Sequence, residues 1–115
     1  METYNYRISV KAFNAIRRFY KNVAKKYSNT YSFADMQKDI KKAYNGIFKI
    51  ENGLLRREPT MSRWKNLHMA SCDKWYYAYS ISEGLDGKRY INVEDACHAQ
   101  NIHEDNDTED YTTQE

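Results

Sequence analysis

The N-terminal part of the chain changes its hydrophobic period once. From position 3 to position 10, apolar or aromatic residues alternate with polar ones, which is the two-residue period of a half-buried strand. From Lys11 onward, apolar residues instead recur every three or four positions, and basic residues occupy the opposite side, namely Lys11, Arg17, Arg18, Lys21 and Lys25. The pattern predicts a strand followed by a basic amphipathic helix that ends near Ser28 and Asn29.

A second apolar stripe follows a helix-start signal. Ser32 with Asp35 three residues later is typical of a capping box, and the stripe then continues to Asn52 and Gly53. The Asn45–Gly46 pair inside it leaves an alternative open, in which the helix ends early and residues 47–50 are extended. Residues 54–62 then form a basic loop that contains the chain's only proline.

Three strands are predicted in the second half of the chain. Residues 63–70 alternate, which places Arg63, Lys65, Leu67 and Met69 on one face. Residues 74–81 place Trp75, Tyr77, Tyr79 and Ile81 on one face and Tyr76 and Ala78 on the other. A glycine-containing turn at 83–88 returns the chain into a strand at 89–95. The order β-α-α-β-β-β predicts an α+β fold with a curved antiparallel sheet packed against an N-terminal helical hairpin.

Composition places this fold in a single domain. The 115 residues include 41% hydrophobic and 15% aromatic residues, enough for one core but not for two. We expect residues 1–103 to form the domain and residues 104–115, EDNDTEDYTTQE, to form an acidic disordered tail. The start of the chain lacks signal-peptide features and no long apolar run follows, so a cytoplasmic protein without a membrane segment is expected. Cys72 and Cys97 are then most simply two free thiols.

The net charge of +2 hides a segregation of the two signs. Six of the 16 acidic residues lie at 104–115, and without them 18 basic residues face 10 acidic ones, a net charge of +8. Such a charge attracts polyanions, so nucleic acid is the first partner class to consider. The alternative is ordinary solubility charge on solvated faces.

The element order and four segments resemble the RelE/ParE superfamily of type II toxin–antitoxin toxins. The segments are YRISVKAFNAIRRFY, RREPTMSRWKNLHMA, KWYYAYSI and INVEDACHAQNI, within residues 4–103. The resemblance implies a toxin that inhibits growth and is neutralised by a cognate antitoxin protein. In a RelE-like protein the activity would be ribosome-dependent, metal-free endoribonuclease cleavage of mRNA during translation. In a ParE-like protein the target would instead be DNA gyrase. A third alternative is a non-enzymatic binding module with the toxin fold.

Metal-free RNA cleavage needs a general base, a general acid and cations that stabilise the charge on the phosphorane. Histidine and arginine suit these roles, and the resemblance points to His98 as a catalytic histidine. We add His68, Arg63 and Lys65 as further catalytic candidates, and Arg56, Arg57 and Tyr76 as RNA-binding ones. The alternative for the histidines is a half-buried, hydrogen-bonded side chain. Relatives commonly carry an arginine in the aromatic strand, where this chain has Tyr76 or Tyr77.

Other site chemistries have little support in the sequence. His68, Cys72, Cys97 and His98 are zinc-binding residue types, but their spacing along extended chain does not converge on one ion. The phosphate-loop, nucleophile-elbow and zinc-protease motifs do not occur in the sequence. We therefore predict no metal site and no cofactor.

Overall fold

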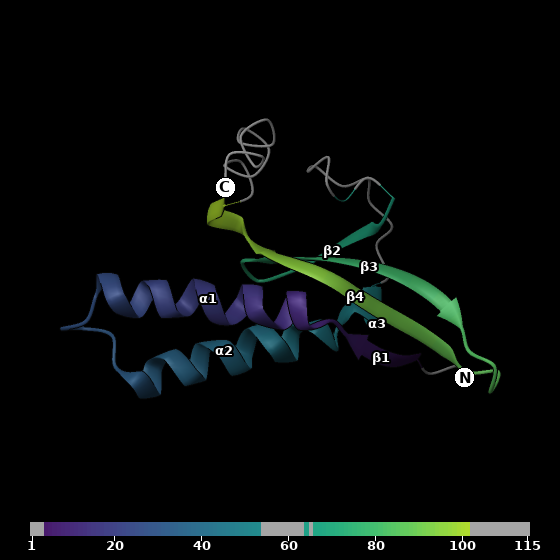
Figure 1. Ribbon diagram of the computed structural model, residues 1–115, viewed down its shortest axis with the longest axis horizontal. Helices are drawn as coiled ribbons and strands as arrows, with labels where there is room; N and C mark the ends of the chain where they lie inside the picture. Colours follow the sequence, from purple (N-terminus) through teal and green to yellow (C-terminus); the bar gives the residue numbers. More distant parts are fainter. Residues whose placement is uncertain (1–3, 54–63, 65, 102–115) are drawn as a thin grey trace.

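The computed structural model describes residues 4–53, 64 and 66–101. The elements, in chain order, are β1 (Tyr4–Ile8), α1 (Val10–Lys26), α2 (Phe33–Ile47), α3 (Ile50–Gly53), β2 (His68–Cys72), β3 (Trp75–Glu83) and β4 (Arg89–His98). The predicted α+β class is confirmed, because the hairpin of α1 and α2 packs against a four-stranded sheet and projects beyond it (Figure 1). The boundary predicted at residue 103 and the tail at 104–115 lie outside the described residues.

The two long helices begin where the sequence predicts them. Ser9 caps α1, and its hydroxyl accepts a hydrogen bond from the Ala12 N–H at 2.9 Å. Ser32 and Asp35 form the predicted capping box of α2, each side chain accepting from the other's backbone N–H. The alternative in which residues 47–50 are extended is wrong. The α2 helix continues through Gly46 to Ile47, and α3 begins at Ile50 after a short turn.

The sheet is mixed rather than wholly antiparallel, which corrects the prediction. Its strand order is β1-β4-β3-β2, in which β2–β3 and β3–β4 are antiparallel and β1–β4 is parallel. The antiparallel helices return the chain toward the sheet, and the β2–β3–β4 meander then brings β4 beside β1 in the same direction. Alternation along a chain marks a strand but contains no information about its neighbour's direction.

The first strand of this meander is shorter at its start than predicted. We expected a strand from Arg63, but β2 begins at His68, and Trp64 lies in a helical turn closed by the Leu67 N–H and the Trp64 carbonyl at 2.9 Å. The Trp64 indole is 1% exposed and donates from Nε1 to Asp95 Oδ2 at 2.9 Å. Burial of this large ring and its hydrogen bond hold the chain in a turn where alternation alone favoured a strand.

Apolar residues cover both faces of the sheet. The face toward the helices carries Trp75, Tyr77 and Tyr79, which are 3%, 0% and 0% exposed, so the predicted grouping of these three residues on one face is confirmed and that face is buried. The other face carries a smaller cluster made of Trp64, Met69, Ala78 and Cys97, with Leu67 and Tyr76 partly buried against it.

A β-bulge decides which residues of β4 reach each face. Ala78 pairs with Asp95 and Tyr79 pairs with Val93, so Glu94 is the extra residue on β4. The bulge reverses the alternation, so that Ile91 and Val93 before it, and Ala96 after it, all lie in the helix-side core. It is held against the start of α1, where Ser9 donates from N to the Val93 carbonyl and from Oγ to the Glu94 carbonyl. His98, two residues after Ala96, consequently lies on the helix side of the sheet.

Within the described part of the chain, we find no helix with the length and apolar character needed to cross a bilayer.

Candidate nucleic-acid interface

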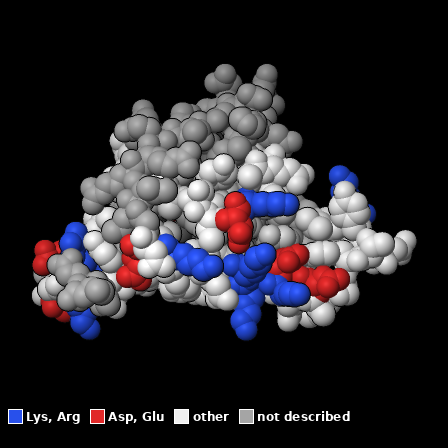
Figure 2. Space-filling view, turned by 180° about the vertical axis from the view of Figure 1, so that it is seen from behind, with Lys and Arg blue, Asp and Glu red and all other residues white. Residues whose placement is uncertain are grey.

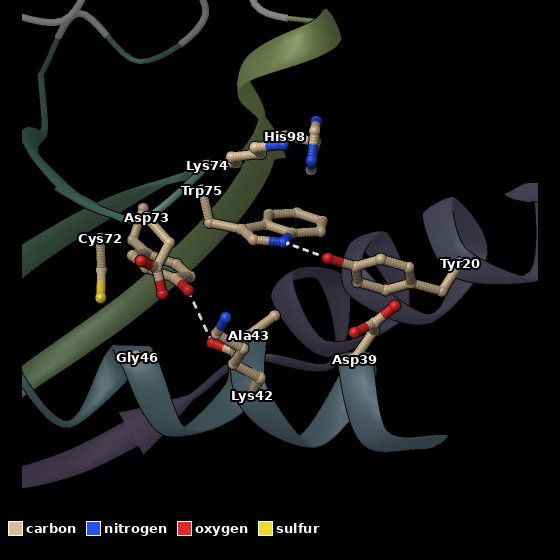
Figure 3. Close-up of a pocket in the computed structure, with 11 residues that line it drawn as sticks. Tyr20, Asp39, Lys42, Ala43, Gly46, Cys72, Asp73, Lys74, Trp75 and His98 are labelled. Carbon is tan, nitrogen blue, oxygen red and sulfur yellow. Dashed lines mark hydrogen bonds between the residues drawn. The ribbon is translucent and has the colours of Figure 1, made fainter. Parts of the chain in front are cut away.

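A hollow of about 570 Å³ lies between the helical hairpin and the β2–β3 turn (Figure 3). Its α2 wall consists of residues spaced three or four apart on one helix face: Asp39, Lys42, Ala43 and Gly46. The stretch from Cys72 to Trp75 forms the opposite side, and Tyr20 of α1, Tyr77 and His98 complete the lining. We call this the central hollow. Two hydrogen bonds tie its walls together: Trp75 Nε1 donates to Tyr20 Oη at 3.0 Å, and Tyr77 Oη donates to the Ala43 carbonyl at 2.6 Å.

The central hollow belongs to a series of four neighbouring hollows. A second one, of about 190 Å³, shares Trp75 and His98 with it, and a third, of about 330 Å³, shares Arg18 and Asn22 with the second. A fourth, of about 440 Å³, shares Lys42, Gly46, Cys72 and Asp73 with the central hollow. We call the series the groove. Each hollow shares lining residues with the next, so the four are neighbours from α1 past His98 to α2.

Basic side chains line both ends of the groove. On the α1 side they are Arg17, Arg18, Lys21 and Lys25, and on the α2 side they are Lys38, Lys41, Lys42 and Lys49, with Lys74 between the two groups. Two carboxylates, Asp39 and Asp73, also line the central hollow. On the face of the molecule that Figure 2 shows, Lys and Arg side chains are interspersed with Asp and Glu side chains, so this face is not uniformly positive.

His98 stands between the central and the second hollow. Its ring stacks on Phe19 with centroids 4.0 Å apart and an interplanar angle of 12°, and it meets Trp75 edge-on at 5.3 Å. Burial, and then the nearby Lys74 ammonium, lower the pKa of His98 below its usual 6.5. His98 Nδ1 accepts a hydrogen bond from the Gln100 backbone N–H at 3.0 Å, so the neutral ring carries its proton on Nε2. His98 is therefore a neutral N–H donor near pH 7. A general acid would need the protonated imidazolium form of His98. In that form Nδ1 also carries a hydrogen, which would point at the Gln100 N–H and replace the hydrogen bond with repulsion.

The β2–β3 turn fixes the rim of the central hollow. Asp73 and Lys74 join the paired residues Cys72 and Trp75 as a two-residue hairpin, and Asp73 has a φ of 55°. Aspartate tolerates this left-handed conformation better than most residues. The Ala99 N–H donates to the Lys74 carbonyl at 2.6 Å, which ties the turn to the end of β4.

The structure does not bring His68 and His98 together. His68 pairs with Tyr79 and His98 pairs with Trp75, four residues apart along β3 and on opposite sides of it. Four residues span about 13 Å along a strand, and two strand spacings add about 10 Å across the sheet. A shared acid–base mechanism therefore fails on distance. His68 instead packs near the Tyr79 ring, with centroids 5.4 Å apart. The last strand is also longer than the predicted 89–95, and His98 is its final residue.

The remaining candidates lie away from the groove or outside the described residues. Tyr76 is half-buried in the small cluster on the far face of the sheet, where it does not line the groove. Arg56, Arg57, Arg63 and Lys65 lie outside the described residues.

The groove contains residues that the sequence reasoning did not single out. Lys38, Lys41, Lys42 and Asp39 stand on the polar side of α2, whose apolar stripe alone had been used to predict the helix. The sequence analysis recognised the basic side of α1 but not that of α2. Lysines on the polar side of α2 were the sequence signal that would have indicated the second wall of the groove.

The cysteines and histidines do not converge on one centre. The strand registers put Cys72 opposite Trp75, whereas Cys97 lies opposite Tyr76 and belongs to the far-face cluster. The two cysteines are not joined in a disulfide. Among residues 4–53, 64 and 66–101, we find no group of three or more His, Cys, Asp or Glu side chains placed to hold a metal ion.

Comparison of this chain with protein-family models, curated proteins and solved structures found no match.

Proposed function

We propose that this protein is the toxin of a toxin–antitoxin pair, similar to RelE/ParE proteins, and that it acts on single-stranded RNA bound along the groove. The observation that carries the RNA part of the proposal is the series of four hollows with cations at both ends and His98 in the middle. The antitoxin, ribosome and mRNA as partners follow from the sequence resemblance.

The groove has the chemical features that single-stranded RNA needs. Lysine and arginine side chains attract the phosphates, and a hollow of about 570 Å³ is large enough for a nucleotide. The lining includes the aromatic rings of Trp75 and His98, which suit a base better than a phosphate. A duplex would need a broad, open surface, whereas these hollows favour unpaired nucleotides.

Two activities are compatible with this binding. In the first, RelE-like cleavage on the ribosome, His98 contacts the RNA, and Arg63 and Lys65 supply further cations. In the second, the protein binds RNA without cutting it. The second is favoured by one observation, the hydrogen bond from Gln100 N–H to His98 Nδ1, because it opposes the protonation that a general acid requires.

A binding experiment tests RNA binding along the groove, which both activities require. We would measure the affinity for a labelled single-stranded RNA decamer by fluorescence anisotropy between about 50 and 300 mM NaCl. Over this range the logarithm of the binding constant should fall linearly with the logarithm of the salt concentration. Arg18→Gln and Lys42→Gln each remove one groove cation and should each lower the salt slope by about 0.7. Lys88→Gln is the matched control, because Lys88 is exposed in the β3–β4 turn and does not line the groove. Equal weakening by all three variants would reduce the binding to unspecific charge attraction.

Expression in growing bacteria tests the activity. A cleaving toxin should stop growth and cut ribosome-bound mRNA, and both effects should be lost in His98→Ala or Arg63→Ala. Growth arrest with intact mRNA and a DNA-damage response would select the gyrase alternative. Harmless expression with retained RNA binding would select the non-enzymatic one.

A further inference from the structure

The central hollow contains a carboxylate that a phosphate-binding surface alone does not explain. Asp39 projects from α2 into the hollow toward Tyr20 (Figure 3), and it is only partly exposed. Tyr31 Oη donates to Asp39 Oδ2 at 2.6 Å, which fixes the orientation of the carboxylate. Burial and the neighbouring Asp39 carboxylate raise the pKa of Tyr31, so its hydroxyl remains a donor across the physiological range.

A carboxylate with a fixed orientation disfavours the phosphates of an RNA chain and favours its bases. It repels phosphates, and it accepts hydrogen bonds from the N–H groups of bases. Guanine alone among the four RNA bases presents two adjacent donors, N1–H and N2–H, on its Watson–Crick edge. Adenine and cytosine each present one amino group there, and the uracil N3–H lies between two carbonyl oxygens that a carboxylate repels.

Asp39 retains the acceptor capacity that a guanine edge requires. Each carboxylate oxygen has two lone-pair sites, and Tyr31 uses one of the four. Beside Asp39 (Figure 3), Tyr20 Oη accepts from Trp75 Nε1, so the Tyr20 hydroxyl keeps a proton to donate. Guanine O6 is an acceptor adjacent to N1–H, and a donor beside a carboxylate therefore complements the same edge of the base.

We propose, on the basis of the RNA-binding function proposed above, that the central hollow selects a guanine base. Asp39 accepts from guanine N1–H and N2–H, and Tyr31 is a positioning residue that holds the carboxylate. Lys42 and Lys74, which line the same hollow, contact the phosphates that flank the base. The protein then prefers RNA with an unpaired guanine over RNA of the same charge without one.

The test uses labelled RNA hexamers that differ in one base. UUGUUU should bind about tenfold more tightly than UUUUUU, with the adenine and cytosine versions between them. Replacing guanosine with inosine removes only the N2 amino group and should lose about half of the preference on a logarithmic scale. Asp39→Asn should abolish the preference while leaving UUUUUU bound as tightly as before or more tightly, because a phosphate-repelling charge is gone.

The matched control is Asp73→Asn on the opposite rim of the same hollow. Asparagine also tolerates the positive φ at this position, and Asp73 is exposed, so the variant should change all hexamers equally and keep the guanine preference. Tyr31→Phe should reduce the preference without changing the affinity for UUUUUU. Thermal unfolding of each variant separates these effects from loss of fold.

The outcomes distinguish this inference from the function on which it rests. If the wild-type protein binds none of the hexamers, the proposed RNA-binding function is wrong. If it binds all of them equally, RNA binding stands and the guanine proposal is overturned. A guanine preference that survives in Asp39→Asn also overturns the proposal, because another group would then read the base.

Discussion

Gly46 offers a sharp test of how closely α2 packs on the sheet at the floor of the groove. It lies in the last turn of α2, one residue before the helix ends, where replacing glycine with alanine ordinarily stabilises a helix by up to about 1 kcal/mol. Here an added Cβ would lie 3.0 Å from Tyr77 Oη and 3.2 Å from Cys72 Sγ. Both contacts are tighter than normal van der Waals distances, so Gly46→Ala must displace a neighbour.

Tyr77, the nearer of the two neighbours, does not move freely, and this makes the expected effect destabilising. Tyr77 is fully buried, and its hydroxyl donates to the Ala43 carbonyl at 2.6 Å. Moving the ring loses a buried hydrogen bond worth about 1 kcal/mol, and overpacking in a core typically costs about 1–3 kcal/mol. After the gain in helix propensity, Gly46→Ala should lower the free energy of unfolding by about 1–3 kcal/mol. For a domain of this size, each kcal/mol corresponds to about 4–8 °C in Tm.

Thermal and urea unfolding of four variants would check this reasoning. Asn45→Ala is the control for propensity, because Asn45 is an exposed neighbour in the same helix, and it should be neutral or slightly stabilising. Tyr77→Phe removes the closest contact, so Gly46→Ala should be at least about 1 kcal/mol less harmful in that background than in the wild type. A rise in Tm for Gly46→Ala alone would refute the close-packing argument.

Three further predictions concern contacts that hold β4. Trp64→Phe leaves the buried Asp95 carboxylate without its indole donor and should lower the free energy of unfolding by about 1–3 kcal/mol in urea titrations, whereas an unchanged midpoint would contradict the role of this bond. Ser9→Ala removes the α1 cap and should cost about 1 kcal/mol in the same assay, and a cost near zero would show that the cap is dispensable. Because burial lowers the pKa of His98, the unfolded chain binds more protons below about pH 6.5, so stability falls as pH decreases. His98→Phe, which keeps a ring against Phe19, should flatten the Tm–pH curve in this range, and parallel curves for the two proteins would contradict the assignment.

Local pattern predicted most of the elements because neighbours in sequence determine them. The 3.6-residue period gave α1, the Ser32–Asp35 pair gave the start of α2, and alternation gave β3 with its buried aromatic face. Each depends on side chains within a few residues of one another, which contact the same helix or strand face in any fold. The charge segregation, and with it the expectation of a polyanionic partner, also comes from the sequence alone.

The candidate site depends on contacts between residues far apart in the chain. Uninterrupted alternation along β4 would put His98 on the face away from the helices, and the bulge at Glu94 turns it toward Phe19 and the groove. That bulge packs against Ser9, 85 residues earlier, through a hydrogen bond to the Glu94 carbonyl. The parallel pairing of β1 with β4 and the approach of Gly46 to Cys72 likewise depend on contacts between residues that are far apart in the chain.

The sequence by itself therefore determined the kinds of elements, their order, the aromatic core and the excess of positive charge. Only the tertiary structure decided which strands are neighbours, where β4 shifts its register, and which polar side chains share a hollow with His98. The reason is physical: propensity, capping and periodicity act over a few residues, whereas strand register and groove walls arise from packing between segments that are distant along the chain.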